Sequence, residues 1–137
     1  MATIQLSVAC RNRRLDSIET ECSTSAVLRL RTGSLPSSCG AANSGTVVST
    51  ITLTSDWAAA ASNGSKAFNN TPFSDTSAAL GGTLGHFRLY QTDGSTCVMQ
   101  GDITATGGGG ALTVDNTSVN QGQQITITSW TITDGNA

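Results

Sequence analysis

Four cysteines are the residues of this chain best suited to covalent or metal chemistry, namely Cys10, Cys22, Cys39 and Cys97. Their spacing matches no zinc template, because the chain has no C-x-x-C pair and only one histidine. If the segment carrying the first two is one continuous helix, Cys10 and Cys22 lie about 18 Å apart along its axis. A disulfide needs Cα atoms within about 4.4 to 6.8 Å of each other. Cys10 and Cys22 are therefore not expected to pair.

Three states of the cysteines are compatible with the sequence. They are reduced thiols buried as small hydrophobic groups, thiols paired with Cys39 or Cys97 inside the fold, and thiols paired with another chain. The last state predicts interchain disulfides through any of the four positions. Buried reduced thiols are the favoured state, and the location of Cys10 and Cys22 on the N-terminal segment strengthens the interchain alternative, because an exposed thiol there would meet a partner.

Acid–base chemistry has few candidates. The single histidine, His86, begins a predicted strand beside Gly85, and no G-x-S-x-G motif accompanies it, so a structural or surface role is favoured. The aspartates stand mostly beside Gly, Ser or Asn, where their side chains cap turns, and nothing marks a glycosidase pair. The glycine runs 81–82 and 107–110 lack the Lys and the strand-to-helix context of a phosphate-binding loop. We predict no catalytic, cofactor-binding or metal-binding residue, and no cofactor.

Three aromatic residues, Trp57, Tyr90 and Trp130, would form a sugar-stacking platform if they were exposed. So few large aromatics in a small domain more often anchor the core. We therefore favour packing for them, and keep a glycan site in the loops between Asp56 and Leu84 as the alternative.

Composition describes a single β-rich domain. The chain has 137 residues, of which 12% are charged and 4% aromatic, and Thr, Ser, Gly and Ala dominate. A net charge of −2 excludes a long basic track for nucleic acid. No apolar run approaches the roughly 18 residues of a membrane span, and the charges at the N-terminus follow a very short apolar piece, the reverse of a secretory signal. We expect neither a nucleic-acid nor a membrane partner, and synthesis and folding in the cytoplasm.

The chain divides into two predicted parts, a helical segment and a β domain. Residues 1–24 predict a short amphipathic helix, with Ser7 at the N-cap, that forms a docking arm. The residues expected to contact a partner are Val8, Arg11, Arg14, Leu15 and Ile18. Residues 25–137 predict the β domain.

Alternating apolar residues and turn signals locate the strands of that domain. They are expected over 26–31, 46–53, 86–92, 95–103, 112–119 and 123–133, with one or two short strands between 56 and 84. Within 46–53, alternation predicts that Val47, Ile51 and Leu53 share one face. Asp93-Gly94 predicts a hairpin that places Leu89 opposite Val98 and Tyr90 opposite Cys97. In the last strand Ile127 and Trp130 have opposite parity, which predicts a bulge near Ser129 or a strand serving two surfaces.

Seven or so short strands with Gly-rich turns favour a particular architecture. We predict a mainly β fold, an antiparallel β-sandwich of jelly-roll or Ig-like type with a short N-terminal α-helix, over a closed barrel.

Taken together, these segments resemble a family of small structural proteins of tailed bacteriophages. The resemblance covers nearly the whole chain. It rests on Arg11-Asn12-x-Arg14-Leu15-Asp16-x-Ile18, residues 27–33, His86 to Tyr90 with Asp93-Gly94, and residues 114–119 continuing through Gly122 to 125–133.

The resemblance implies a non-enzymatic virion component present in many copies on the head, neck or tail. We expect a capsid decoration or neck/collar protein that docks on other virion proteins, or on copies of itself, through its N-terminal arm. The alternative is a host-surface carbohydrate-binding module of a tail or fibre. The chain is richer in cysteine than such proteins usually are, which suggests cross-linking of virion subunits outside the reducing cytoplasm.

Overall fold

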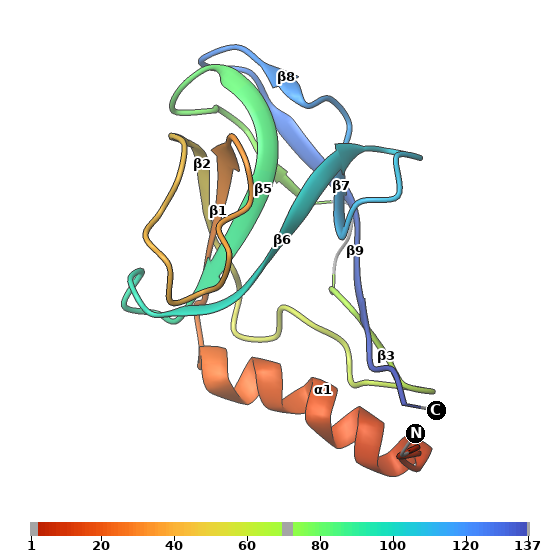
Figure 1. Cartoon of the computed structure of the whole chain (residues 1–137). Helices are drawn as coiled ribbons and strands as arrows, with labels where there is room; N and C mark the ends of the chain where they lie inside the picture. Colours follow the sequence, from red (N-terminus) through yellow and green to blue (C-terminus); the bar gives the residue numbers. More distant parts are fainter. Residues whose placement is uncertain (1–2, 70–72, 137) are drawn as a thin grey trace.

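The computed structural model describes residues 3–69 and 73–136 of the chain. Within them it has one helix and nine strands (Figure 1). In chain order these are α1 (Val8–Cys22), β1 (Val27–Thr32), β2 (Val47–Thr52), β3 (Ser65–Ala67), β4 (Phe73–Asp75), β5 (Gly82–Tyr90), β6 (Cys97–Ala105), β7 (Leu112–Val114), β8 (Ser118–Val119) and β9 (Ile125–Thr133). No helix in this part of the chain is long and apolar enough to cross a membrane.

The strands form one continuous hydrogen-bonded sheet in the order β2-β1-β5-β6-β7-β9-β3. On its outer edge β9 pairs with β4 and then with β3, one after the other, and β8 pairs with the start of β5. The described strand pairs are antiparallel except β6 with β7, which is parallel. The carbonyl of Val48 in β2 accepts hydrogen bonds from the amides of Ala79 and Leu80, so the segment after β4 covers the β2 edge.

The sheet folds over to enclose one core. Phe87 of β5 meets Trp130 of β9 edge-to-face, with ring centroids 5.1 Å apart, although two strands separate β5 from β9 in the sheet. Leu28 and Leu30 of β1 join the same cluster as Ile127 of β9, and all three side chains are fully buried. The predicted mainly β fold with an N-terminal helix is therefore confirmed, and the parallel pair β6–β7 departs from the predicted, purely antiparallel sandwich.

Bulges explain where the predicted register succeeds and fails. Tyr90 lies opposite Cys97 as predicted, but Leu89 lies opposite Met99, because the register shifts by one residue between the two pairs. The predicted bulge near Ser129 is confirmed, since Thr113 pairs with Ser129 while Val114 pairs with Ile127.

A third bulge, between β1 and β2, changes which valine of β2 faces the core. Alternation placed Val47, Ile51 and Leu53 together, but Leu30 pairs with Ser49 while Arg31 pairs with Val47. The skipped residue, Val48, is fully buried in the core, whereas Val47 is half-buried. Strict period-two counting fails at such a position, because one extra residue inverts the pattern.

A glycine run makes the parallel connection between β6 and β7 short. Only residues 106–111 separate the two strands, although parallel neighbours ordinarily need a crossover of about a dozen residues. Gly107 and Gly109 have φ of +87° and +81°, which disfavours side chains, and a Cβ at Gly108 or Gly110 would lie 2.8 Å from Thr104. A side chain is therefore disfavoured for steric reasons at each of these four positions.

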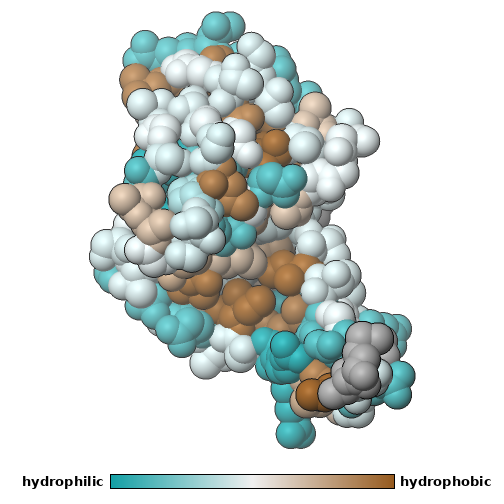
Figure 2. All heavy atoms as spheres, in the orientation of Figure 1, coloured by the Kyte–Doolittle hydropathy of each residue, from teal (hydrophilic) through white to brown (hydrophobic). Residues whose placement is uncertain are grey.

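The helix lies across one end of the β body (Figure 1). Ser7 is its N-cap as predicted, accepting a hydrogen bond from the Cys10 amide at 3.2 Å. On the face drawn in Figure 2, hydrophobic side chains gather in a hollow between the strands and the helix. Ile18 of α1 and Met99 of β6 are half-buried and pack against the core.

Candidate functional site

Basic side chains gather on the outer face of β1 and β5, opposite the core. Arg29 pairs with Arg88 and Arg31 pairs with His86 across the two strands, so all four side chains project from the same side. We call these four residues the cationic face. His86, Arg88 and Arg31 are 0%, 2% and 7% exposed. Among the described residues, none of the three arginines and no atom of His86 is in ion-pair contact with a carboxylate.

The cover of this face is the connection from β1 to β2, residues 33–46, here named the covering loop. It contains no charged side chain. Its ends are joined, because the Thr32 amide donates to the Thr46 carbonyl at 3.0 Å and the Thr46 amide to the Thr32 hydroxyl at 2.9 Å. Gly33 and Gly45 have φ of +81° and +62°. The loop is thus an Ω-loop that turns on a glycine at each end.

Arg88 is the centre of the contact between the cationic face and the covering loop. Its guanidinium donates to the Asn43 side-chain oxygen at 2.6 Å and to the backbone carbonyls of Ser38, Cys39 and Ala41 at 2.8 to 3.2 Å. On β6 it donates to the Gln100 side-chain oxygen at 3.0 Å. These acceptors are all neutral. An arginine can satisfy its fork of donors in this way without a counter-ion.

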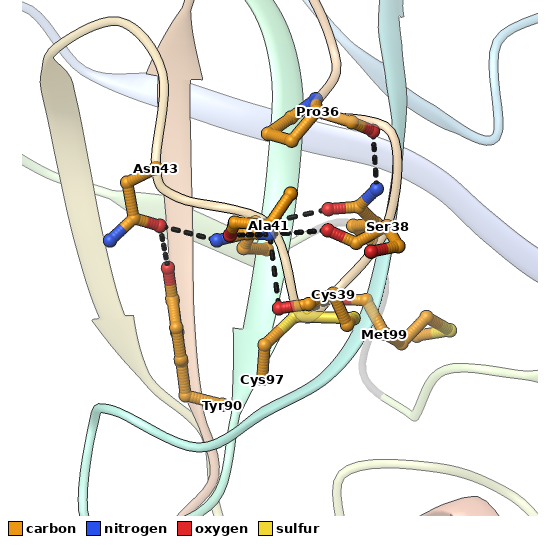
Figure 3. Close-up of a disulfide and its surroundings, with 10 residues drawn as sticks. Pro36, Ser38, Cys39, Ala41, Asn43, Tyr90, Cys97 and Met99 are labelled. Atoms are coloured by element: carbon orange, nitrogen blue, oxygen red, sulfur yellow. Dashed lines mark hydrogen bonds between the residues drawn. A yellow bond between two sulfur atoms is a disulfide. The ribbon is translucent and has the colours of Figure 1, made fainter.

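Neighbouring side chains extend the same contact. The Tyr90 hydroxyl donates to Asn43 at 2.8 Å, and Figure 3 shows Tyr90 pointing from its strand toward Asn43 in the loop. The Gln100 amide donates to the Pro36 carbonyl at 2.7 Å. Arg31 donates to the carbonyls of Ser44 and Gly45 at 3.0 and 3.3 Å. The loop backbone therefore supplies most of the acceptors for the cationic face.

A disulfide fixes the loop covalently. Cys39 in the loop is bonded to Cys97 at the start of β6, with Cα atoms 5.4 Å apart (Figure 3). This corrects the prediction of interchain disulfides at these two positions, because each sulfur already has its partner inside the chain. Spacing along the chain gave no sign of the pair, since connectivity depends on the fold.

His86 stands at the base of the loop. Its Nδ1 lies 3.0 Å from the Gly33 carbonyl oxygen, which can only accept, so Nδ1 carries the proton. Nε2 is buried without a hydrogen-bond partner among the described residues. Burial lowers the pKa of His86 and, although the Gly33 carbonyl raises it, the charges of Arg31 and Arg88 lower it further. The structural role favoured for this residue agrees with these contacts.

The predicted docking residues divide into two groups. Leu15 is 4% exposed and Ile18 packs against the core, so both contact this chain's own β body. Arg11 donates to the Asp134 carbonyl at 3.3 Å, and Arg14 lies 3.2 Å from the Asp134 carboxylate. Val8 is 44% exposed. The amphipathic stripe therefore serves the domain itself, and the surface part of the set lies toward the N-terminal end of α1.

A buried lysine anchors the helix. Lys66 of β3 is 1% exposed, and its Nζ lies 2.7 Å from Asp16 and 3.0 Å from Glu19 of α1. Burial lowers the pKa of Lys66, but the hydrogen bonds and charges of Asp16 and Glu19 outweigh that effect and raise it overall. The hydrogen bond from Lys66 lowers the pKa of Asp16, and one from the Ala61 amide lowers it further.

The two remaining cysteines differ in access. Cys10 is exposed and free, while Cys22 is free and fully buried. Burial raises the pKa of Cys22 to about 11, with smaller contributions from Glu21 and Glu19. An interchain bond through Cys22 thus conflicts with its position in the core, and Cys10 keeps an accessible thiol.

Trp57 and Trp130 belong to an internal aromatic cluster. Trp57 is 3% exposed and stacks on Phe68 with centroids 5.0 Å apart, and Phe68 stacks on Trp130 at 3.3 Å. Tyr90 is 2% exposed. The favoured core-packing role is confirmed for Trp57 and Trp130, whereas Tyr90 is buried on the other face of the sheet, against Asn43 of the covering loop. A pocket of about 160 Å³ opens beside Trp57 and is also lined by Ile51, well below the roughly 300 Å³ at which ordinary ligand pockets begin.

The sequence predicts a loop over 37–45 but gives no indication that it covers the cationic face or that Arg88 is its central contact. The signal available was an uncharged run, 33–46, that follows a strand with two arginines and contains one cysteine. Within the described residues, no cluster of three or more His, Cys, Asp or Glu side chains is arranged to hold a metal. Comparison with protein-family models, with curated proteins and with solved structures gives no match.

Proposed function

We propose that the protein is a non-enzymatic structural component of a tailed-bacteriophage particle, a capsid decoration or neck/collar subunit. The proposal rests on one observation: reactive and charged side chains attach other parts of the chain to the sheet. Arg88, Lys66 and the Cys39–Cys97 disulfide each join an irregular segment or the helix to the sheet. A body tied at so many points suits a part that must keep its shape.

The disulfide supports a location outside the host cell. Such bonds persist in oxidising surroundings and are rare in the reducing cytoplasm. A particle protein folds in the host cytoplasm and meets oxidising conditions after lysis. Cys39 and Cys97 are held together by the loop contacts around them, so this chain would form its bond within the subunit rather than between subunits.

The docking surface we propose is the N-terminal end of the chain. Ile4 is 72% exposed and Val8 is 44% exposed, the former being the most exposed large hydrophobic side chain of the described residues. Arg13 on the same segment is exposed as well. An apolar contact flanked by an arginine is typical of protein–protein interfaces. The partner is another virion protein or a further copy of this chain.

Incorporation into particles tests the proposal. Purified virions are analysed by quantitative mass spectrometry after complementation with the wild type, Val8→Asp or the control Leu80→Asp. Leu80 is 47% exposed and lies far from Val8 in the chain, so both variants alter comparably exposed side chains. We expect Val8→Asp to lower the copy number at least about tenfold, the effect of about 1.4 kcal/mol of lost contact. Absence of the wild-type chain from particles would refute the virion role, and equal incorporation of the variants would refute the docking surface.

Host-glycan binding is the second proposal, and it rests on the small pocket beside Trp57, whose volume would hold only part of a sugar. Its lining includes Thr54 and Asn69 as polar groups beside the indole. A glycan array with the wild type, Thr54→Arg and Leu80→Arg would test it. Binding that only Thr54→Arg abolishes supports the glycan site, and no binding by the wild type removes it.

A further inference from the structure

The covering loop is held over the cationic face by contacts in which the positive charge has no negative counterpart. Arg31 and Arg88 are buried and bonded to carbonyl and amide oxygens. The loop contributes no charged side chain. Such a contact is stable as long as every donor has an acceptor. It offers no carboxylate to balance an additional positive charge.

His86 is the group on this face that can gain a charge. It lies directly across from Arg31 on β1 and two residues from Arg88 on its own strand. Its Nδ1–H holds the Gly33 carbonyl at the end of the loop, and its Nε2 is buried without a partner among the described residues. A second proton would therefore enter a closed site next to two guanidinium groups.

A carboxylate lies on the other neighbouring strand. Asp102 of β6 pairs with His86 in the sheet, but its side chain is exposed and accepts a hydrogen bond from the Ala111 amide at 3.0 Å. It forms no ion pair with His86 in the described part of the chain. Three charged groups thus surround the imidazole: Arg31 on β1, Arg88 on the same strand, and Asp102 on β6. The Asp102 carboxylate is hydrogen-bonded to the Ala111 amide instead of the imidazole.

We propose that residues 33–46 form an acid-sensitive cover, which is released at its Gly33 end when His86 takes up a second proton. Gly33 and Gly45 are the hinges, because both have positive φ and stand at the two ends of the loop. The Cys39–Cys97 bond keeps the middle of the loop attached, so the released cover stays tethered to β6. Opening brings water to Nε2 of His86 and to the arginines.

The direction of the pH dependence follows from proton binding. The closed form binds the second proton of His86 less well than the open form does, because the closed site lowers the pKa of this residue. The opening constant is therefore lowest, and independent of this proton, above the ordinary histidine pKa of about 6.5. Below that value the opening constant rises by up to about tenfold per pH unit, the limit for one proton, until the lowered folded-state value is reached.

Two measurements on the full, oxidised chain test this inference. His86 is the only histidine, so its imidazole NMR signals titrate without overlap. Hydrogen exchange of residues 33–46, corrected for the intrinsic effect of pH, is followed from about pH 7.5 to pH 5. We expect His86 to titrate below about pH 6.5 and protection of the loop to fall over the same range, while the loop 106–111 stays unchanged.

His86→Asn is the matched variant. Its side-chain amide can place a donor near the position of Nδ1 but cannot take up a proton in this range. We expect its loop to keep constant protection from pH 7.5 to pH 5. The proposal is overturned if the wild-type loop keeps its protection while His86 titrates, or if the variant loses protection over the same range as the wild type.

Discussion

The covering loop and helix α1 are both attached to the β body, but by different chemistry. The loop carries no charge and is held by buried cations, neutral oxygens and one disulfide. The helix is held by apolar packing of Leu15 and by ion pairs of Asp16 and Glu19 with Lys66. Salt has little effect on hydrogen bonds between a buried cation and neutral oxygens. It weakens an ion pair whose carboxylates are partly exposed, because dissolved ions screen the attraction between the charges.

Each attachment is therefore weakened by a different protonation step. Adding a proton to His86 strains the loop, because positive charge accumulates there. Adding a proton to Asp16 weakens the helix, because a negative partner of Lys66 is lost. The two segments should therefore separate from the body under different conditions.

Removing the guanidinium of Arg88 should have the largest effect. Arg88→Met removes the donor of five hydrogen bonds to partly buried oxygens, and we expect a loss of about 4 kcal/mol in the free energy of unfolding. Arg29→Met is the control, since Arg29 lies directly opposite but makes one hydrogen bond, to the Gly94 carbonyl. Urea denaturation of the oxidised proteins measures both. Similar losses in the two variants would contradict the central position of Arg88.

Removing the disulfide should rank second. Cys39 and Cys97 are 58 residues apart in sequence, and cross-linking such a loop stabilises a fold by about 2 to 4 kcal/mol, mainly through the unfolded chain. We expect the double variant Cys39→Ser with Cys97→Ser to lose that amount. Cys10→Ser, which changes an exposed thiol, should lose less than about 0.5 kcal/mol. Equal midpoints for the double variant and the wild type would show that the bond adds nothing.

Weakening the helix anchor should have a smaller effect. Lys66→Met replaces a buried cation with an apolar side chain of similar length, and the partners Asp16 and Glu19 are partly exposed. We therefore expect a loss of about 1 to 2 kcal/mol. The variant should also alkylate faster at Cys22, whose thiol becomes accessible when α1 separates. Arg13→Met, at an exposed arginine of the same helix that forms no ion pair in the described part of the chain, should change neither quantity appreciably.

Protonation of Asp16 at acid pH should have the smallest effect on stability. The Lys66 hydrogen bond lowers the pKa of Asp16, so the stability that it contributes is present above the ordinary value of about 3.9 and is lost as the pH falls below it. Because Asp16 is 45% exposed, the loss should not exceed about 1 kcal/mol. Helical circular dichroism between about pH 5 and pH 2.5 measures it. A helix transition near pH 6 would contradict the separation of the two attachments.

Local rules predicted much of the fold. The cap at Ser7 and the strands around Leu28 and Tyr90 follow from short-range patterns, and they are present. The errors lie at bulges, where Val48 takes the core position expected for Val47. A bulge depends on the neighbouring strand, which a single segment does not contain.

The candidate site was less predictable, because irregular segments have no periodicity. Nothing in residues 33–46 predicts that their carbonyls surround Arg88, and disulfide connectivity among four cysteines has three solutions when all pair. The amphipathic stripe of Leu15 and Ile18 correctly predicts that this face of the helix is buried. It does not predict that the β body of the same chain buries it. Hydrophobic patterning reports burial and does not distinguish a neighbouring subunit from the same chain.

One backbone contact has a practical consequence for engineering. The Leu6 amide donates to the Asn136 carbonyl at 2.7 Å, which brings the stretch before the helix beside the stretch after the last strand. A few residues would link them, so a circular permutant opened elsewhere on the surface should fold. Peptides or fluorescent domains fused to either end would leave the body at the same place, side by side.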